Sequence, residues 1–345
     1  MSDESRYFLV LYPQHNEDRH NSSMNAFYEQ TMLACISNGW APQLACENTY
    51  SKILKFRGLS KKIYEIVSDF IGKISGWPGQ LIFFSIIYRI LIGVPNTISI
   101  SQEYISPFFL KKNTTIVHDM IQEKYPRNLF AKYYYVFYIK FFLKKTNCFF
   151  VSETTRNMIE SNFSRSPIIY NIFGNEYVDK KENNNNIPKI YDAMWIGTFA
   201  EHKDIKTVIN AAIILPDINF CLITPSLPSI KLPKNIKAVA NVSNSDISTI
   251  YDQTKILIST SLDEGYGRPA MEGRLKGMAL ILTDIPVFKE LHSDYATFIE
   301  PRNAIGLARA IEEKLKNLEL KYEDKECKRK IFSIDKYALE LEKFF

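Results

Sequence analysis

The sequence predicts an α/β protein of two domains in tandem, each a parallel sheet covered by helices on both faces. Three observations lead to this expectation. The chain has 345 residues, about twice the usual size of a domain. Short runs of β-branched and aromatic residues alternate with helical stretches, which is typical of parallel strands joined by helices. A polar segment with four consecutive asparagines, residues 180–189, interrupts this alternation and is expected to be a linker.

The first half opens with an apolar run, residues 7–13, that we expect to be a strand. A helical pattern over residues 24–38 follows it and stops at Gly39, a residue type that commonly ends helices. The remaining elements expected in this half are strands at 97–101, 114–120 and 147–152 and a helix from about residue 154.

After the linker the alternation starts again. In parallel sheets of this kind, ligands bind beyond the carboxyl ends of the strands, so a ligand site is expected in a cleft between the two domains. The strands are expected at residues 191–197, 219–224, 255–260, 279–284 and 297–300, with a further apolar run at 237–242, and the helices at 204–214, at 246–253 and from about Pro269.

The composition excludes several classes of protein. A hydrophobic fraction of 46% with 23% charged residues rules out wholesale disorder. No apolar run reaches about 18 residues, and the longest, residues 81–94, is interrupted by Arg89, so no membrane span or signal peptide is expected. Five scattered cysteines without a C-x-x-C pair predict neither a disulfide framework nor a zinc site. We therefore expect a soluble, cytoplasmic protein.

The net charge of +5 is unevenly distributed, because residues 51–145 hold 15 basic and 5 acidic residues. The same segment is rich in aromatic residues, and on a helix Tyr134, Phe137, Tyr138 and Phe141 would share one face. One interpretation is a buried core stripe flanked by solvated lysines. The other is a surface that docks on an anionic membrane. No nucleic-acid-binding motif accompanies the charge, so a nucleic-acid partner is not expected.

Residues 260–277, TSLDEGYGRPAMEGRLKG, combine the end of a strand, a glycine-rich loop and a helix from about Pro269. Backbone N–H groups and the positive end of a helix dipole make such a loop a site for an anion such as phosphate. Glu264 and Glu272 frame the loop, with seven residues between them. Two carboxylates there could accept hydrogen bonds from two sugar rings of one ligand. The alternative is a helix N-terminal charge interaction and a solvated glutamate.

The segment EGYGRPAMEG, followed by KGMALILTDIPVFKEL, resembles the nucleotide-sugar signature of retaining glycosyltransferases of family 4, which have the GT-B fold. Three further segments are similar to that family: residues 114–126 (TTIVHDMIQEKYP), 194–223 and 332–345. The resemblance covers most of residues 114–345. It implies two Rossmann-like domains that face each other across a cleft. The expected parts are an acceptor-binding domain at 1–179, the linker at 180–189, a nucleotide-sugar-binding domain at 190–328 and a helix that crosses back at 329–345.

The resemblance also implies roles for individual residues. Glu264 corresponds to the glutamate beside the transferred sugar, and His118 to a histidine that faces this sugar near the reaction centre. For His118 the alternative is a histidine at a strand end with its hydrogen bonds satisfied. Glu272 corresponds to the glutamate that holds the ribose hydroxyls, and Lys203 to the lysine that neutralises the diphosphate. The other donor-binding residues implied are Gly265, Tyr266, Gly267 and Arg268 in the loop, Gly197 and Thr198 after the first strand of the second domain, and Asn241 and Val242 beside the base.

The chain departs from the family pattern in three places. Thr198 follows Gly197 where an arginine is usual, so one of two diphosphate cations is missing unless Arg268 or Lys206 replaces it. The usual glycine-rich loop after the first strand is replaced by HNSSMN, residues 20–25. Gly273 and Arg274 stand where Ala-Met is usual. Gly273 is costly in a helix and is expected to mark the close approach of a ligand or backbone.

The function implied is transfer of a sugar from a nucleoside-diphosphate sugar to a hydroxyl of a glycan acceptor, with retention of configuration. No metal or cofactor is expected, because the chain contains no Asp-x-Asp motif. The basic, aromatic first half favours a lipid-linked oligosaccharide acceptor in bacterial surface-polysaccharide assembly, and a peripheral position on the inner face of the cytoplasmic membrane. Two alternatives stay open. Thr198 leaves room for a non-catalytic partner subunit, and a GT-B sugar-nucleotide epimerase would use the same cleft, although the paired glutamates favour a transferase.

Overall fold

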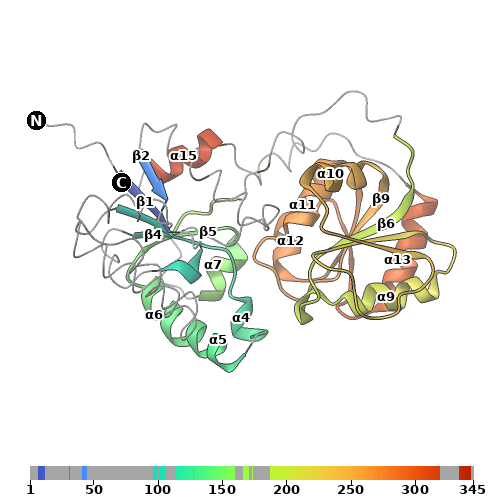
Figure 1. Ribbon diagram of the computed structural model, residues 1–345, viewed down its shortest axis with the longest axis horizontal. Coiled ribbons are helices and arrows are strands. Elements are labelled where there is room, and N and C mark those ends of the chain that lie inside the picture. Colours follow the sequence, from blue (N-terminus) through green and yellow to red (C-terminus); the bar gives the residue numbers. More distant parts are fainter. Residues whose placement is uncertain are drawn as a thin grey trace, which may run out of the picture. The chain divides into compact units, whose positions relative to one another are not determined.

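The chain folds into two compact units, Met1–Ile172 with Ser333–Phe345 and Phe173–Phe332. Each contains one parallel sheet, so the α/β fold class is as predicted (Figure 1). The division falls a few residues before the predicted linker, most of which lies outside the described residues. The computed structural model describes residues 7–11, 31, 41–44, 96–99, 101–105, 113–126, 128–159, 166–170, 173, 187–318 and 334–342.

The first sheet has the strand order β2-β1-β3-β4-β5, and all its pairings are parallel. Strand β2 was not predicted, because its sequence APQL lacks a β-branched run. The predicted helix at 24–38 lies outside the described residues except for Thr31, which is helical. The Thr31 hydroxyl lies 3.0 Å from the Tyr337 hydroxyl on the C-terminal helix α15 (Ile334–Glu342), within this unit. The strands are β1 (Tyr7–Leu11), β2 (Ala41–Leu44), β3 (Asn96–Ser99), β4 (Asn113–Val117) and β5 (Asn147–Phe150).

One long helix covers part of this sheet. Its consecutive segments are α5 (Leu129–Tyr133), the π-helical turn η4 (Tyr134–Ile139) and α6 (Lys140–Leu143), and we call it the aromatic helix. Asn128 caps its start by accepting a 2.8 Å hydrogen bond from the Ala131 N–H. Its buried face joins a core cluster with residues of β4 and β5. The other helical segments of the unit are η2 (Gln102–Tyr104), α4 (Ile121–Lys124) and α7 (Glu153–Ile159).

The second sheet has the strand order β11-β10-β9-β6-β7-β8, again wholly parallel. Its strands are β6 (Tyr191–Ile196), β7 (Phe220–Thr224), β8 (Ile236–Ala240), β9 (Thr254–Ser259), β10 (Ala279–Thr283) and β11 (Thr297–Ile299). Its helical segments are η7 (Glu201–Lys203), α9 (Ile205–Ile214), α10 (Asn244–Asp252), α11 (Arg268–Leu275), α12 (Pro286–His292) and α13 (Ala304–Lys316).

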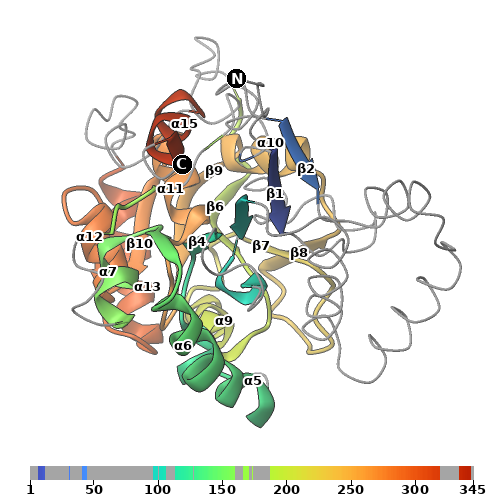
Figure 2. The same cartoon turned by 90° about the vertical axis from the view of Figure 1, so that its left-hand side faces the viewer.

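Helices cover both faces of this sheet (Figures 1 and 2). The alternation of side chains along the strands identifies which helices lie on which face. Ile256, Ile258 and Ile281 share a core cluster with residues of α9 and α13. Leu257 and Leu280 point to the opposite face, against Gly273 of α11, where an added Cβ would lie 2.8 Å from Leu257 Cδ2. The close approach expected at Gly273 is therefore to core side chains, not to a ligand or backbone, and it lets α11 pack tightly on β9 and β10.

In the parts of the chain that the structure describes, no helix is both long enough and apolar enough to cross a bilayer.

Candidate functional site

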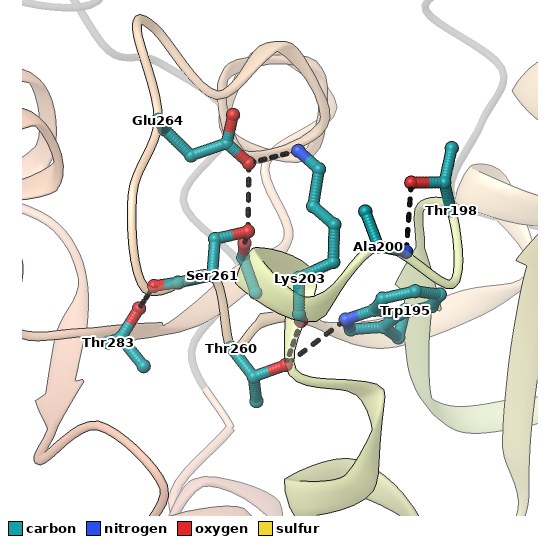
Figure 3. A network of polar contacts seen from close by, with 9 residues as sticks. Trp195, Thr198, Ala200, Lys203, Thr260, Ser261, Glu264 and Thr283 are labelled. Atoms are coloured by element: carbon teal, nitrogen blue, oxygen red, sulfur yellow. Dashed lines mark hydrogen bonds and ion pairs between the residues drawn. The ribbon is translucent and has the colours of Figure 1, made fainter. Parts of the chain in front are cut away.

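Two neighbouring strands, β6 and β9, end beside each other and place the central residues of the site. Directly after β9, the Thr260 hydroxyl donates a 2.9 Å hydrogen bond to the Lys203 carbonyl and accepts a 3.2 Å hydrogen bond from the Trp195 indole N–H (Figure 3). The Leu262 N–H donates to the His202 carbonyl at 2.7 Å. These contacts tie η7 to the loop after β9 and fix the backbone of Lys203 next to that loop.

Glu264 is buried, with 9% of its surface exposed, and its carboxylate is held on two sides. Its Oε1 pairs with Lys203 Nζ and accepts a 2.8 Å hydrogen bond from the Ser261 hydroxyl (Figure 3). The Ser261 carbonyl in turn accepts a hydrogen bond from the Thr283 hydroxyl at the end of β10. The loop and two strands thus determine where this carboxylate points.

Glu272 lies in α11 and is also buried, with 8% exposed. Its Oε2 accepts a 2.8 Å hydrogen bond from the Tyr251 hydroxyl, and its Oε1 lies 3.3 Å from Arg268 Nη2. The Arg268 guanidinium also lies over the Phe173 ring, 4.7 Å from its centre. The carboxylates of Glu264 and Glu272 therefore each have one cation and one hydroxyl donor as partners. Neither is the solvated glutamate of the alternative interpretation.

Gly267 begins helix α11 in a left-handed conformation, with φ +78°. An added Cβ would lie 2.4 Å from Phe288 Cε1, so both the backbone and the space require glycine here. Tyr266 beside it is buried, with its ring centre 6.2 Å from that of Phe173. Gly265 lies between Glu264 and Tyr266. This loop therefore delivers the backbone and the positive end of α11 to the site.

Two of the implied donor residues lie after β6. At Gly197 an added Cβ would lie 2.8 Å from Trp195 Cη2, so the glycine leaves room for the indole that supports Thr260. Thr198 is exposed, and its hydroxyl accepts a 3.4 Å hydrogen bond from the Ala200 N–H, as Figure 3 shows. The residue that replaces the usual arginine thus stabilises a turn.

Asn241 and Val242 follow β8, an edge strand, and Asn241 has φ +54°, a conformation that asparagine tolerates. Three strand spacings separate β8 from β9, which is about 14 Å. The structure therefore places these two residues at the same end of the sheet as the glutamates but not beside them.

His118 lies in the first unit, directly after β4, and is partly buried. Its backbone N–H donates a 3.0 Å hydrogen bond to Gln102 Oε1. Gln102 is almost fully buried, and its Nε2 donates to the Asp119 carbonyl at 2.7 Å. One amide side chain therefore fixes the backbone on both sides of the histidine.

Three residues that hold predicted site residues in place, each within its own unit, were not predicted from the sequence. Ser261 lies within the segment that carries Glu264, and its hydroxyl was the one local signal available. Tyr251 is 21 positions before Glu272 in the chain, on another helix, and Gln102 is 16 positions before His118. Neither spacing belongs to a helical or strand repeat, so only the tertiary fold reveals these contacts.

Arg274, one of the departures from the family pattern, has a fully buried side chain. Its Nη1 donates to the Leu291 carbonyl at 2.8 Å, and both its terminal nitrogens bond the Asp294 carboxylate. The guanidinium also lies over the Tyr295 ring. Arg274 therefore joins α11 to the end of α12 and holds the helix in place.

Over the described ranges, no three His, Cys, Asp or Glu side chains are grouped so that they could hold a metal ion.

Together, the two parallel-sheet units and the loop-helix site define the GT-B class of fold. Residues 178–330 match the family described as "Glycosyl transferases group 1". Along its whole length the chain is similar in structure to a sucrose-phosphate synthase from Thermosynechococcus elongatus. That comparison gives a TM-score of 0.71 and 13% identity and covers 98% of each chain.

Two curated relatives are mannosyltransferases. The chain is 24% identical over 225 residues to the O-antigen chain mannosyltransferase RfbU of Salmonella typhimurium, which covers 62% of this chain and 64% of the relative. It is 33% identical over 83 residues to the serotype-specific mannosyltransferase WbdA of Escherichia coli, covering 24% of this chain and 10% of that protein. The chain thus matches less than two thirds of the length of either relative.

Proposed function

We propose that the chain is a glycosyltransferase that moves a hexose from a nucleoside-diphosphate sugar to a hydroxyl of a glycan acceptor. The observation that carries this proposal is the pair of buried carboxylates, Glu264 and Glu272, held on either side of the N-terminus of α11. Carboxylates accept hydrogen bonds from sugar hydroxyls, and the start of a helix attracts phosphate. One ligand that carries ribose, diphosphate and hexose satisfies both features.

In this proposal Glu272 binds the ribose hydroxyls, while Lys203 and the start of α11 bind the diphosphate. Lys203 now pairs with Glu264, so donor binding turns its ammonium group from the carboxylate to the phosphate oxygens. Glu264 is then released to accept hydrogen bonds from the hexose. Ser261 keeps the carboxylate oriented during this exchange, because its hydroxyl bonds the same oxygen, Oε1.

The reaction breaks the bond between the anomeric carbon and the diphosphate oxygen, and it forms a bond from that carbon to the acceptor oxygen. We propose that the acceptor attacks from the face that the diphosphate leaves and gives its proton to the leaving phosphate oxygen, which retains the anomeric configuration. Lys203 and the α11 dipole stabilise the negative charge that develops on the leaving group, so the proposal needs no metal ion. His118 is proposed to face the hexose from the first unit.

The acceptor and the sugar are proposed from the relatives. RfbU and WbdA are both named as mannosyltransferases, and RfbU acts on the O-antigen chain, so mannose is the first hexose to test. We propose a lipid-linked glycan as acceptor, presented at the inner face of the cytoplasmic membrane. The 15 basic against 5 acidic residues of segment 51–145 support a peripheral position there.

A thermal-shift panel of UDP, GDP, dTDP, ADP and their hexoses tests the proposal. A ligand that binds only the native state raises stability by about 2.7 kcal/mol at a hundredfold excess over its Kd. We expect a shift with one nucleotide series that is lost in Glu272→Ala and kept in the control Glu312→Ala, which removes an exposed carboxylate of α13. No shift with any nucleotide would contradict the proposal. Product NMR checks the anomeric configuration, and EDTA checks the need for a metal.

Thr198 favours a second candidate, a non-catalytic partner subunit, because its side chain serves a turn where a diphosphate cation is usual. The two candidates differ in turnover. The partner role requires that the wild-type protein transfers no sugar while Glu264→Gln still disrupts the pathway in cells.

A further inference from the structure

The aromatic helix of the first unit exposes a row of large apolar side chains along most of its length. Leu129, Tyr133, Phe137 and Phe141 follow one another at intervals of four residues, with Phe130 beside the first of them. Each has between 54% and 72% of its surface exposed. Five such side chains on one helix form a far larger apolar surface than the single exposed residues that soluble proteins tolerate.

The interpretation of this segment as a buried core stripe accounts only for the face of the helix opposite the exposed row. Tyr135, Ile139 and Leu143 are buried in the core against β4 and β5. Tyr134 and Tyr138 are partly buried, and their hydroxyls donate to the carbonyls of Glu103 and Ile105 at 3.2 and 3.4 Å. The face predicted for Tyr134, Phe137, Tyr138 and Phe141 is therefore divided, because the two tyrosines turn toward the sheet and the two phenylalanines toward solvent.

The π-helical turn keeps the exposed residues in one row. In a regular α-helix, residues four apart advance by about 40° round the axis at each step, so the row would wind away. A π turn bonds each residue to the fifth one along and therefore holds more residues per turn, which reverses this drift. The rings of Tyr133 and Phe137, on either side of the start of the π turn, are stacked with centres 6.0 Å apart.

The charged residues of the aromatic helix and its flanks are all basic. Between Glu123 and Glu153 the sequence holds six basic residues and no acidic one. Lys132, Lys144 and Lys145 are exposed, and Lys145 Nζ lies 4.7 Å from the centre of the Phe141 ring. Lys140 instead pairs with Glu123 at 2.8 Å. Exposed aromatic side chains among lysines are the composition of helices that lie in the interface of an anionic bilayer.

We propose that this face of the aromatic helix docks on an anionic lipid bilayer, with the five apolar side chains in the headgroup boundary and the lysines against lipid phosphates. The helix then lies in the plane of the membrane. The inference deepens the proposed function and rests on it for the identity of the acceptor, because docking would hold the enzyme where a lipid-linked glycan is presented. The docking itself depends only on the exposed row and its charge.

Vesicle flotation of the full chain tests the proposal. One set of vesicles is pure phosphatidylcholine, and the other contains about one third of the anionic lipid phosphatidylglycerol. We expect binding only to the anionic vesicles. The variant F130S/F137S/F141S is expected to lower the partition coefficient about tenfold or more. The variant K132Q/K144Q/K145Q is expected to lower it on the order of a hundredfold, since each surface lysine contributes roughly fivefold.

Matched controls come from the second unit. The variant I213S/L227S removes two apolar side chains that are also more than 60% exposed, and K231Q/K316Q removes two exposed lysines. Both are expected to bind vesicles as the wild type does. Equal binding by the aromatic-helix variants and these controls would overturn the proposal. So would a wild-type dimer that the phenylalanine variant abolishes, because the face would then be a protein interface.

Sugar transfer to a short-chain acceptor in detergent separates this inference from the proposed function. The aromatic-helix variants are expected to keep the wild-type rate there, because none of the altered residues belongs to the site. Vesicle binding without any transfer would contradict the proposed function alone, and transfer without vesicle binding would contradict the docking alone.

Discussion

The hydroxyl of Tyr251 donates a 2.8 Å hydrogen bond to Oε2 of Glu272, from a tyrosine with no exposed surface. This contact joins α10 to α11 and leaves Oε1 of the same carboxylate to Arg268. The Glu272 side chain is therefore held in one orientation, and in the donor complex proposed above this would lower the entropy cost of binding.

Replacing Tyr251 by phenylalanine removes this contact and leaves the carboxylate with Arg268 alone. We expect a loss of about 1–3 kcal/mol in stability, because a buried acceptor loses its donor. Donor affinity should fall about five- to tenfold. Urea unfolding and calorimetric titration of the nucleotide measure the two effects. Tyr295→Phe is the control, since its hydroxyl bonds the Met278 carbonyl, and it should lower stability without changing the affinity. Unchanged affinity in Tyr251→Phe would contradict the role of Glu272.

Replacing Lys203 by methionine separates diphosphate binding from nucleoside binding. A charge-assisted hydrogen bond contributes about 1.5–3 kcal/mol, so the Kd for a nucleoside diphosphate should rise about 10- to 100-fold. The Kd for the nucleoside should not change. Lys206→Met is the matched control, because Lys206 is exposed in the first turn of α9. An equal loss in that variant would show that Lys206 supplies the second diphosphate cation.

Gly267→Ala adds a methyl group where both the backbone and the neighbouring ring exclude it. The left-handed conformation and the contact with Phe288 together predict a loss of about 2–4 kcal/mol in stability. Adding Phe288→Leu to the Gly267→Ala variant should restore the part of the stability that is lost through the contact with the ring. Thermal unfolding of both variants measures this, and full stability in Gly267→Ala would mean that the loop has another conformation.

Arg274→Met tests whether the buried guanidinium is structural. Met leaves the Leu291 carbonyl without its donor, whereas Asp294 is 42% exposed at its side chain and regains water. We expect a loss of about 1–3 kcal/mol in stability and an unchanged donor Kd. The reverse result, weaker donor binding at full stability, would place Arg274 in the site. Urea unfolding and nucleotide titration distinguish the two.

Burial raises the pKa of the Cys221 thiol on β7 to about 11, from an ordinary value of about 9. The folded state therefore keeps the proton that the unfolded state releases. The stability linked to this thiol is complete below pH 9 and is lost as the pH rises from 9 to 11, by roughly 2–3 kcal/mol. Urea unfolding at pH 8 and pH 10.5 should show a smaller decrease in Cys221→Ala than in the wild type. Equal decreases would contradict this assignment.

The strands and helices of the second unit lie close to the positions predicted from the sequence, and there is a physical reason for this agreement. Most of its strands are short, largely buried runs, as in FCLIT and TKILIS, and they are bounded by polar turns, so the alternation of strand and helix locates them. Strand β2 has neither feature and was missed. The placement of Glu264 on the loop before α11 and of Glu272 within that helix was predicted from the expected helix start near Pro269. The hydroxyls that orient them come from other elements, and no local pattern encodes those contacts.

The aromatic helix shows the same limit. Its apolar residues were recognised, but they were assigned to one face by the period of a regular α-helix, and the π turn changes that period. The core interpretation holds for Ile139 and Leu143, whereas Phe137 and Phe141 lie in solvent, and the docking of their face on a membrane stays a prediction.

The π turn makes the length of this helix as important as its composition. The turn takes up one residue more than an α-helical turn, so the same residues wound as an uninterrupted α-helix would place everything beyond it rotated by about 100° relative to Leu129. That rotation would take Ile139 and Leu143 out of the core and carry Phe141 out of line with Tyr133. One residue of length therefore sets both the packing on β4 and β5 and the alignment of the outer surface.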